Sequence, residues 1–209
     1  FRNKIKSSFA YDLLKNKNFD LVFFDSWKSI EHFNGTNQIK KICLIHGNEI
    51  LNLKKKERII KSLKKVDKVL FNSNFTKNLF YKQLPELSDL PSMVIFPAFI
   101  ENINYTDDEK KYDLCTIARL EYRKGHHLVL EALSKLKNEK NLILTYAILG
   151  DGPELSKLKD LVIKNNLLHQ VDFINNKNSS DVYKQSKVHV MPTITTQDSI
   201  EGFGISNVE

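Results

Sequence analysis

Short apolar runs alternate with longer amphipathic stretches along most of the chain. The apolar runs have the length of β-strands, and stretches between them, such as His127 to Leu136 and Glu154 to Lys164, carry apolar residues at helical spacing. This alternation is typical of βα units around parallel sheets, so the sequence predicts an α/β fold. The expected strands are Phe19 to Phe24, Lys41 to His46, Lys68 to Asn72, Met93 to Phe96, Leu114 to Ala118, Leu142 to Leu149, Val171 to Ile174 and Val188 to Met191.

One polar stretch interrupts this alternation. Glu101 to Lys111 shows neither period and carries clustered charge, which is typical of a linker between domains. We therefore predict an N-terminal Rossmann-like domain at residues 1–98, a linker at 99–111 and a C-terminal Rossmann-like domain at 112–209. Each domain is expected to contain a parallel sheet.

The composition is typical of a globular protein with buried cores. Of 209 residues, 41% are hydrophobic and 27% are charged. No apolar run approaches the roughly 18 residues that a membrane-spanning helix needs. Cys43 and Cys115 both lie in apolar runs, where a thiol behaves as a small buried hydrophobe. These features predict a cytoplasmic protein with reduced, buried cysteines.

The net charge of +7 is carried entirely by the first half of the chain. Residues 1–111 hold 20 Lys and Arg against 13 Asp and Glu, whereas residues 112–209 hold 12 of each. Much of the excess falls in residues 53–65, where four apolar residues can share one helical face beneath a basic one. Those apolar residues are Leu53, Ile59, Ile60 and Leu63. Such a surface can meet anionic lipid, and a solvated, lysine-rich helix explains the pattern equally well.

A cluster of cations follows the strand expected at Leu114 to Ala118. The chain has 4 Arg against 28 Lys, yet Arg119 and Arg123 both fall in this loop, next to Lys124. Guanidinium groups bind phosphate oxygens through paired hydrogen bonds and a lysine adds a point charge, so the loop is a candidate diphosphate site. The alternative is a set of exposed basic residues at a helix start, which the positive end of the helix dipole disfavours.

Three further signals lie where other strands end. The glycines of Gly150 to Gly152 indicate a tight βα turn and nothing more specific. Glu201 to Gly204 precedes an expected helix, and its backbone N–H groups can hold a phosphate or a sugar hydroxyl. Glu209 follows Glu201 with seven residues between them, so both carboxylates could reach one ligand. His46 stands at the carboxyl end of a strand, where structural and catalytic roles are both open.

In combination, these segments resemble the family 4 retaining glycosyltransferases, which have two Rossmann-like domains in the GT-B arrangement. The Arg-Lys-Gly block and the Glu-Gly-Phe-Gly block followed by a second Glu are the specific parts of the resemblance. Because the family's domains begin earlier and continue past Glu209, the resemblance implies a fragment truncated in both domains. The matching pieces, in chain order, are IHGNE, VDKVLFNSNFTKNLF, VIFPAFI, ARLEYRKGHHLVLEAL, ILGDGPELSKL, VDFIN, VYKQSKVHVMPT and EGFGISNVE.

The resemblance implies catalytic roles for four residues. Arg119 and Lys124 match the pair that contacts the donor diphosphate and stabilises the leaving group without a metal ion. Glu201 matches the residue that faces the hydroxyls of the transferred sugar, and His46 matches one that approaches the sugar from the other domain. No protein nucleophile, cofactor or metal is implied.

The same resemblance implies a second group of residues that bind the donor. Glu209 matches the residue that accepts the ribose hydroxyls, and the amides of Gly202 to Gly204 match groups that reach the sugar or phosphate. The expected donor-binding residues are Arg123, Gly202, Phe203, Gly204 and Glu209.

The implied function is transfer of a sugar, with retention of its anomeric configuration, from a UDP- or GDP-linked donor to a lipid-linked or glycan acceptor. The resemblance places this reaction in the synthesis of lipopolysaccharide, capsule or exopolysaccharide, in the cytoplasm or peripherally on the inner face of the cell membrane. A nucleotide-sugar epimerase of the same architecture is one alternative, although it would not need the Arg-Lys-Gly block. A noncatalytic basic binding protein is another, but no nucleic-acid partner is expected because no nucleic-acid motif is present.

Overall fold

The computed structural model describes residues 19–31, 33, 39–98, 110–175, 177–204 and 206 of the chain. They form two compact units, each with a four-stranded parallel sheet, which confirms the predicted α/β fold. The first unit comprises Phe1–Ala98 with Gln197–Phe203, and the second comprises Phe99–Thr196 with Gly204–Glu209. Residues 99–109 of the expected linker lie outside the described residues.

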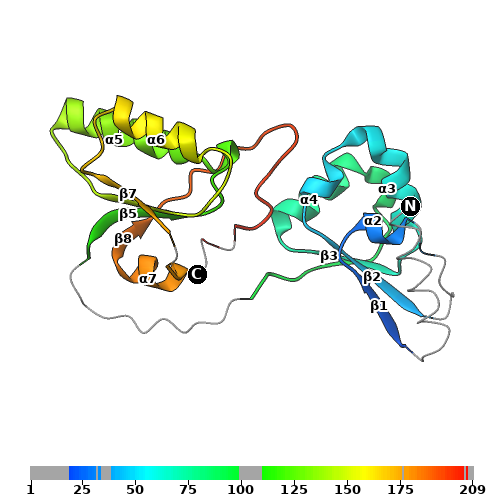
Figure 1. The fold of residues 1–209 in the computed structure, drawn as a ribbon. Helices are drawn as coiled ribbons and strands as arrows, with labels where there is room; N and C mark the ends of the chain where they lie inside the picture. The colour runs from blue at the N-terminus through cyan, green and yellow to red at the C-terminus, as the bar shows by residue number, and fades with distance from the viewer. Residues whose placement is uncertain are drawn as a thin grey trace. The chain divides into compact units, whose positions relative to one another are not determined.

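The first unit is a parallel sheet in the order β1-β2-β3-β4 with helices packed on one face (Figure 1). Its strands are β1 (Leu21–Phe24), β2 (Lys40–Ile45), β3 (Lys68–Phe71) and β4 (Ser92–Val94). Its helices are α2 (Trp27–Ile30), α3 (Lys56–Leu63) and α4 (Asn74–Gln83), with 3₁₀ turns η1 (Asn48–Ile50), η2 (Leu53–Lys55) and η3 (Pro85–Leu87).

The core of the first unit follows from the alternation of side chains along its strands. Cys43 and Val69, which are neighbours in the β2–β3 register, are both fully buried beneath the helices. Trp27 of α2 and Phe80 of α4 join the same cluster. Residues of the opposite parity, such as Phe23, are exposed on the other face of the sheet.

The lysine-rich segment is not one continuous amphipathic helix. Leu53 lies in the separate turn η2 and is 54% exposed, so the predicted apolar face that included it is wrong. The reason is local: the Asn52 side chain accepts a hydrogen bond from Lys54 N and begins a 3₁₀ turn before α3 starts. Ile59 and Leu63 of α3 are fully buried, as the helical spacing predicts.

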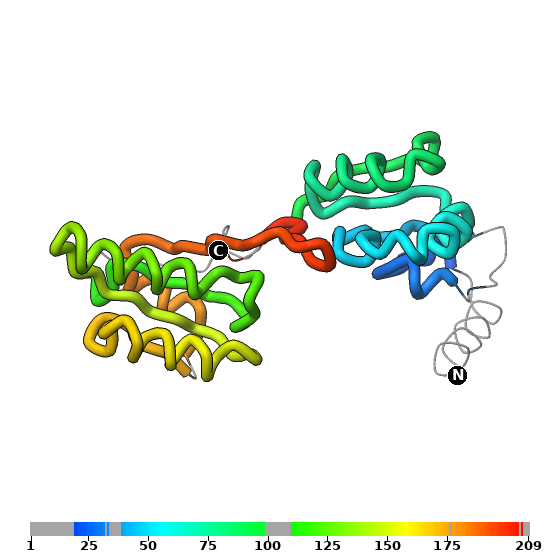
Figure 2. Tube along the Cα trace, turned by 90° about the horizontal axis from the view of Figure 1, so that it is seen from above, coloured from blue at the N-terminus to red at the C-terminus, as the bar shows by residue number. Residues whose placement is uncertain are grey.

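The second unit is a parallel sheet in the order β7-β6-β5-β8. Helices α5 and α6 lie side by side over one face (Figure 2), and α7 lies on the other face (Figure 1). Its strands are β5 (Tyr112–Ile117), β6 (Tyr146–Leu149), β7 (Val171–Ile174) and β8 (Ser186–His189). Its helices are α5 (His126–Lys140), α6 (Leu155–Lys164) and α7 (Ser179–Lys184), with the 3₁₀ turn η4 (Tyr122–Lys124).

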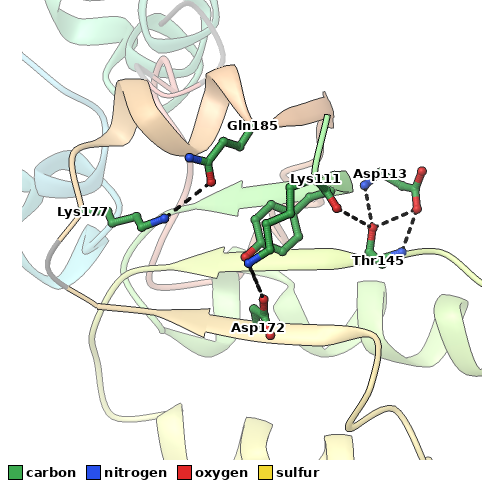
Figure 3. A network of polar contacts seen from close by, with 7 residues as sticks. Lys111, Asp113, Thr145, Asp172, Lys177 and Gln185 are labelled. Atoms are coloured by element: carbon green, nitrogen blue, oxygen red, sulfur yellow. Dashed lines mark hydrogen bonds and ion pairs between the residues drawn. The ribbon is translucent and has the colours of Figure 1, made fainter. Parts of the chain in front are cut away.

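A polar network ties the amino ends of the second unit's strands together (Figure 3). The carboxylate of Asp113 accepts hydrogen bonds from Lys187 Nζ at 2.8 Å and from the backbone N–H of Thr145 at 2.8 Å. The Lys187 bond, followed by the Thr145 N–H, lowers the pKa of Asp113 to about 2. The hydroxyl of Tyr112 donates to Asp172 in the same way, at 2.7 Å. These contacts fix the strand ends opposite to those that carry the candidate site.

Cys43 and Cys115 are buried and form no disulfide, as the sequence predicts. Burial raises the pKa of both thiols, so they stay protonated and act as apolar side chains. Among the helices that the structure describes, none combines the length and the apolar character needed to cross a bilayer.

Candidate functional site

The strand order of the second unit creates a switch point beside β5. From β5 the chain proceeds outward to β6 and β7, then returns to place β8 on the other side of β5. Open α/β sheets bind ligands outside the carboxyl ends of their strands at such a point. The two segments that leave the sheet there are residues 118–125, after β5, and residues 190–194, after β8.

The turn after β6 braces the segment that follows β5. Leu120 exchanges backbone hydrogen bonds with this turn, donating to Asp151 O at 2.8 Å and accepting from Glu154 N at 3.0 Å. A Cβ atom on Gly150 would overlap the carbonyl oxygen of Ala118, and Gly150 has a positive φ of 153°. The glycine turn therefore supports the cationic segment, a role that the sequence alone did not assign to it.

Two arginines of η4 and its approach pair with a single carboxylate, and a lysine follows them in η4. Arg119 Nη2 lies 3.0 Å from one oxygen of Glu121, and Arg123 Nε lies 3.1 Å from the other. The Arg119 side chain is 73% exposed, whereas Lys124 as a residue is only 9% exposed. We name Arg119, Glu121, Arg123 and Lys124 the cationic turn. With three cations and one anion it carries a net positive charge, which suits an anionic ligand.

The cationic turn leads directly into the N-terminus of α5 through Gly125. Gly125 has a φ of 75° and is the N-cap residue of α5, where it has no side chain that could accept from the first N–H groups of the helix. A Cβ atom at Gly125 would overlap the carbonyl oxygen of Pro192, and Ile194 N donates to Arg123 O at 2.7 Å. The segment after β8 thus packs against the cationic turn, and the first N–H groups of α5 add a positive dipole end beside it.

Two polar side chains flank this contact with buried atoms that lack hydrogen-bond partners among the described residues. His126 is 1% exposed, and neither of its ring nitrogens has a hydrogen-bond partner within the described part of the chain. Burial, followed by the nearby charges of His127 and Lys124, lowers the pKa of His126 to about 4, so its ring is neutral at physiological pH. The hydroxyl oxygen of Thr193 is likewise buried and unsatisfied.

A chain of buried hydroxyls fixes the segment after β8. Tyr146 donates to Thr116 Oγ1 at 2.6 Å, and Thr116 donates to the carbonyl oxygen of Val190 at 2.5 Å. Burial raises the pKa of Tyr146, so its hydroxyl keeps the proton that it donates. Val190 N also donates to Cys115 O at 2.8 Å. The start of the segment is therefore held to β5 by one backbone and one side-chain hydrogen bond.

In the first unit, His46 follows β2 with an exposed side chain. Its backbone N–H donates to Glu49 Oε1 at 2.7 Å, and its carbonyl oxygen accepts from Asn72 Nδ2 at 3.3 Å. Gly47 follows with a φ of 117°, which lets the chain turn sharply into η1. The backbone of His46 is thereby fixed while its ring stays accessible.

The segment Gln197–Phe203, which we name the strap, lies against His46 within the first unit. Ile200 N donates to Asn48 Oδ1 at 2.7 Å, and Ser73 Oγ donates to Gly202 O at 2.5 Å. Glu201 lies between these two anchored residues. The structure therefore brings Glu201 and His46 together in one unit, although the sequence placed them in different domains.

The remaining predicted site residues are placed less uniformly. The Phe203 ring lies 6.1 Å from the Phe96 ring, centroid to centroid, within the first unit. Gly204 is buried in the second unit and has a φ of 78°. Glu209 lies outside the described residues, so its expected proximity to Glu201 stays a prediction.

A family model described as "Glycosyl transferases group 1" matches residues 98–209. This chain belongs to that family. The matched residues include the whole of the cationic turn and the strap. A glycosyltransferase of Methanocaldococcus jannaschii, MJ1178, whose name calls it uncharacterized, is 26% identical to the group 1 chain over 175 residues.

Solved structures share the GT-B fold of this glycosyl transferase family member. The pneumococcal O-GlcNAc transferase GtfA, in a complex with UDP and GlcNAc, has a TM-score of 0.68 at 16% identity and covers 96% of this chain. The lipopolysaccharide outer core galactosyltransferase WaaB has a TM-score of 0.66 at 14% identity and covers 99%. These likenesses support the fold class predicted from the sequence.

The chain spans only part of each relative. The match to MJ1178 covers 82% of this group 1 chain and 46% of MJ1178, and the structural matches cover 42% of the GtfA chain and 58% of the WaaB chain.

Sequence reasoning missed several residues of this group 1 site. Glu121 was not singled out, although its position between Arg119 and Arg123 was a signal that it would pair with them. His126 and Thr193 carried no distinctive pattern, and only their burial without partners draws attention to them. Asn48 and Ser73 resemble ordinary turn and cap residues, so their contacts with the strap could not be read from spacing.

Proposed function

We propose that the chain is the donor-binding part of a retaining glycosyltransferase that takes its sugar from a UDP- or GDP-linked donor. The observation that carries this proposal is the position of the cationic turn at the switch point of the second sheet, directly before the N-terminus of α5. That position suits a diphosphate because guanidinium groups, an ammonium group and helix N–H groups converge there.

In this proposal Arg119 and Lys124 hold the donor diphosphate. As the bond between the sugar and the phosphate breaks, negative charge grows on the leaving diphosphate, and fixed cations stabilise that charge. Arg123 supports the same group from its position against Glu121 and the segment after β8. An incoming diphosphate can draw Arg119 from Glu121, because the Arg119 side chain is largely exposed and the ion pair is therefore weak.

Glu201 and His46 are proposed to contact the transferred sugar. A carboxylate accepts hydrogen bonds from sugar hydroxyls, and the exposed ring of His46 can serve as donor or acceptor. The amides of Gly202, Phe203 and Gly204 and the carboxylate of Glu209 are proposed to complete donor binding. No protein nucleophile is assigned: the leaving phosphate helps to deprotonate the acceptor on the same face of the sugar.

Relatives support the chemical class of the substrates. GtfA was crystallised with UDP and GlcNAc, which favours a nucleotide-sugar donor for this chain. WaaB is named as a lipopolysaccharide outer core galactosyltransferase, which favours a cell-surface glycan as the product. Metal independence is part of the proposal, because the cationic turn offers positive side chains in the place of a bound cation.

The test is transfer of radiolabelled sugar from UDP-, GDP- and ADP-linked donors by the full-length protein, with and without a chelator. Transfer that persists in EDTA, from one donor class, is the expected result. Interconversion of the nucleotide sugar without transfer would identify an epimerase instead. No binding of any nucleotide sugar would leave the noncatalytic alternative.

We also propose cytoplasmic, peripheral attachment of the first unit to an anionic membrane face, which would bring the enzyme to a lipid-linked acceptor. Lys54, Lys61 and Lys64 are exposed in the same lysine-rich segment as the exposed apolar side chain of Leu53, a composition that suits an acidic lipid surface. Other cations of this region are engaged internally: Lys56 pairs with Glu86 at 2.8 Å, and Lys65 Nζ donates to the carbonyl oxygen of Glu31. Fewer lysines are therefore available than the sequence suggested.

A further inference from the structure

The strap is anchored on both sides of Glu201. On one side, the N–H of Ile200 donates to Asn48 Oδ1 at 2.7 Å. On the other side, the carbonyl oxygen of Gly202 accepts from Ser73 Oγ at 2.5 Å. The residues on either side of Glu201 are therefore both hydrogen-bonded to the first unit, and these bonds fix the backbone from which the Glu201 carboxylate extends.

The Ser73 hydroxyl has two tasks in this arrangement. Its oxygen accepts from Thr76 N at 3.0 Å and so caps α4, while its single proton can go either to Gly202 O at 2.5 Å or to Thr76 Oγ1 at 3.1 Å. The shorter distance assigns the proton to Gly202. Ser73 and Thr76 are both buried, and without the strap the Ser73 proton would keep only the longer contact with Thr76 Oγ1.

Steric fit makes the contact specific. A Cβ atom at Gly202 would overlap the carbonyl oxygen of His46, so only glycine lets the strap approach this closely. A Cβ atom at Gly47 would lie 2.8 Å from Cδ1 of Ile200, whose side chain is almost fully buried. Gly47 thus lies against the strap and Gly202 lies against the turn after β2. A Cβ atom at either glycine would push the two segments apart.

We propose that Asn48 and Ser73 are positioning residues, which fix the backbone of Glu201 beside His46 and so orient the transferred sugar. This inference rests on the proposed function, in which Glu201 and His46 contact that sugar. Neither Asn48 nor Ser73 belongs to the cationic turn. Their loss should therefore reduce the rate of sugar transfer far more than it weakens binding of the nucleotide.

The decisive variant is Asn48→Ala in the full-length protein. We expect kcat to fall about tenfold, which corresponds to about 1.4 kcal/mol, while the Kd for UDP or GDP measured by calorimetry stays within twofold. Deuterium exchange at the Ile200 amide should become faster, because that N–H loses its acceptor. Asn48→Asp keeps an oxygen at the same place and should restore both the slow exchange and most of kcat.

Asn52→Ala is the matched control. The Asn52 side chain also accepts a backbone N–H bond, from Lys54 at 3.1 Å in the same unit, but that bond lies within its own turn rather than with the strap. It should leave kcat and the exchange of Ile200 unchanged. If Asn48→Ala and Asn52→Ala behave alike in kcat, the positioning role is refuted.

A second pair guards against a variant that simply unfolds. Ser73→Ala removes a helix cap and a strap contact, whereas Ser26→Ala removes only the cap of α2, where Ser26 Oγ accepts from Lys28 N. Both variants should lower the thermal stability, but only Ser73→Ala should also lower kcat. Equal losses of kcat in both variants would overturn the proposal. If the unaltered protein transfers no sugar, the proposed function fails, and the exchange of Ile200 alone then decides whether Asn48 anchors the strap.

Discussion

The cationic turn of the second unit is built from loops of a single sheet, whereas the strap site of the first unit joins residues from distant parts of the chain. Arg119 to Lys124 are near neighbours in sequence, and the glycine turn that braces them follows the adjacent strand. Asn48 and Ile200, by contrast, are 152 residues apart. A ligand-binding turn can therefore be local in sequence while the contact that completes another site is not.

The two sites also differ in how their charge is held. At the cationic turn, Arg119 and Arg123 share the carboxylate of Glu121, and with Lys124 the turn keeps a net positive charge. At the strap, the polar contacts are neutral hydrogen bonds to backbone groups, and they fix geometry rather than charge. We expect loss of the first to affect binding of the nucleotide and loss of the second to affect transfer of the sugar.

Exchanging a glycine at each site gives the largest expected effects and separates the two roles. Gly125→Ala places a Cβ atom against Pro192 O on a residue whose backbone is left-handed. Gly202→Ala places a Cβ atom against His46 O. Each should cost roughly 3 kcal/mol, or about 100-fold, at the site that it distorts. Gly125→Ala should weaken nucleotide binding in calorimetry, and Gly202→Ala should slow transfer far more than it weakens nucleotide binding. The same defect in both variants would abolish the distinction.

The pH dependence of stability gives a test that needs no activity. The pKa of buried His126 is about 4 in the folded chain and ordinarily 6.5, so the unfolded chain binds the proton more readily. The contribution of neutral His126 to the free energy of unfolding is therefore complete above pH 6.5, and it is lost as pH falls towards 4. Between pH 7.5 and 5 the loss should be about 2 kcal/mol of unfolding free energy.

Denaturant titrations of His126→Phe at these two pH values check this prediction. The variant keeps an aromatic ring but cannot titrate, so its stability should change less with pH than that of the unaltered chain. His127→Phe, on the neighbouring ring that stacks on Tyr122, serves as the control and should retain most of the dependence, because burial is the main cause of the lowered pKa of His126. An identical pH dependence in all three proteins would contradict the assignment of the effect to His126.

Most strands and helices could be predicted from the sequence, because each sheet is built from local βα units. The expected strand at Lys68 to Asn72 and the helix at Glu154 to Lys164 differ from the observed elements by one residue at an end. The strand expected at Leu142 to Leu149 begins only at Tyr146, because apolar character alone does not mark where pairing with β5 starts. Apolar spacing also could not reveal that Asn52 would detach Leu53 from α3.

The sequence predicted the candidate site only where the functional residues are close neighbours along the chain. Arg119, Arg123 and Lys124 stand out because charged groups cluster before a helix. The bond from Ser73 to Gly202 is not encoded in either local sequence, since Ser73 has the pattern of any N-cap residue. Such a contact depends on how the strap returns to the first unit, which is a property of the tertiary fold.

Removing single cations from the cationic turn should have a smaller effect than distorting it. Arg119→Ala or Lys124→Ala should weaken nucleotide binding or transfer by about 1.5 to 3 kcal/mol, because each removes one charge-assisted contact. Arg119→Ala should do so without loss of stability, since its pair with Glu121 is exposed. Lys135→Ala, at an exposed position of α5, is the control. Unaltered rates and affinities in both variants would remove the diphosphate assignment.

The smallest expected effect concerns the surface of the first unit, where charge is available for a partner much larger than a nucleotide. Lys61 is exposed on α3, and each lysine near an anionic lipid surface contributes about 1 kcal/mol at most. Lys61→Gln should therefore weaken co-sedimentation of the full-length protein with phosphatidylserine vesicles about fivefold, and Lys135→Gln in the second unit should not. Binding should also decrease as salt rises, because counterions screen the attraction. Equal binding to neutral and anionic vesicles, or the same loss from both substitutions, would show that the excess charge of the first half of the chain has no role at a membrane.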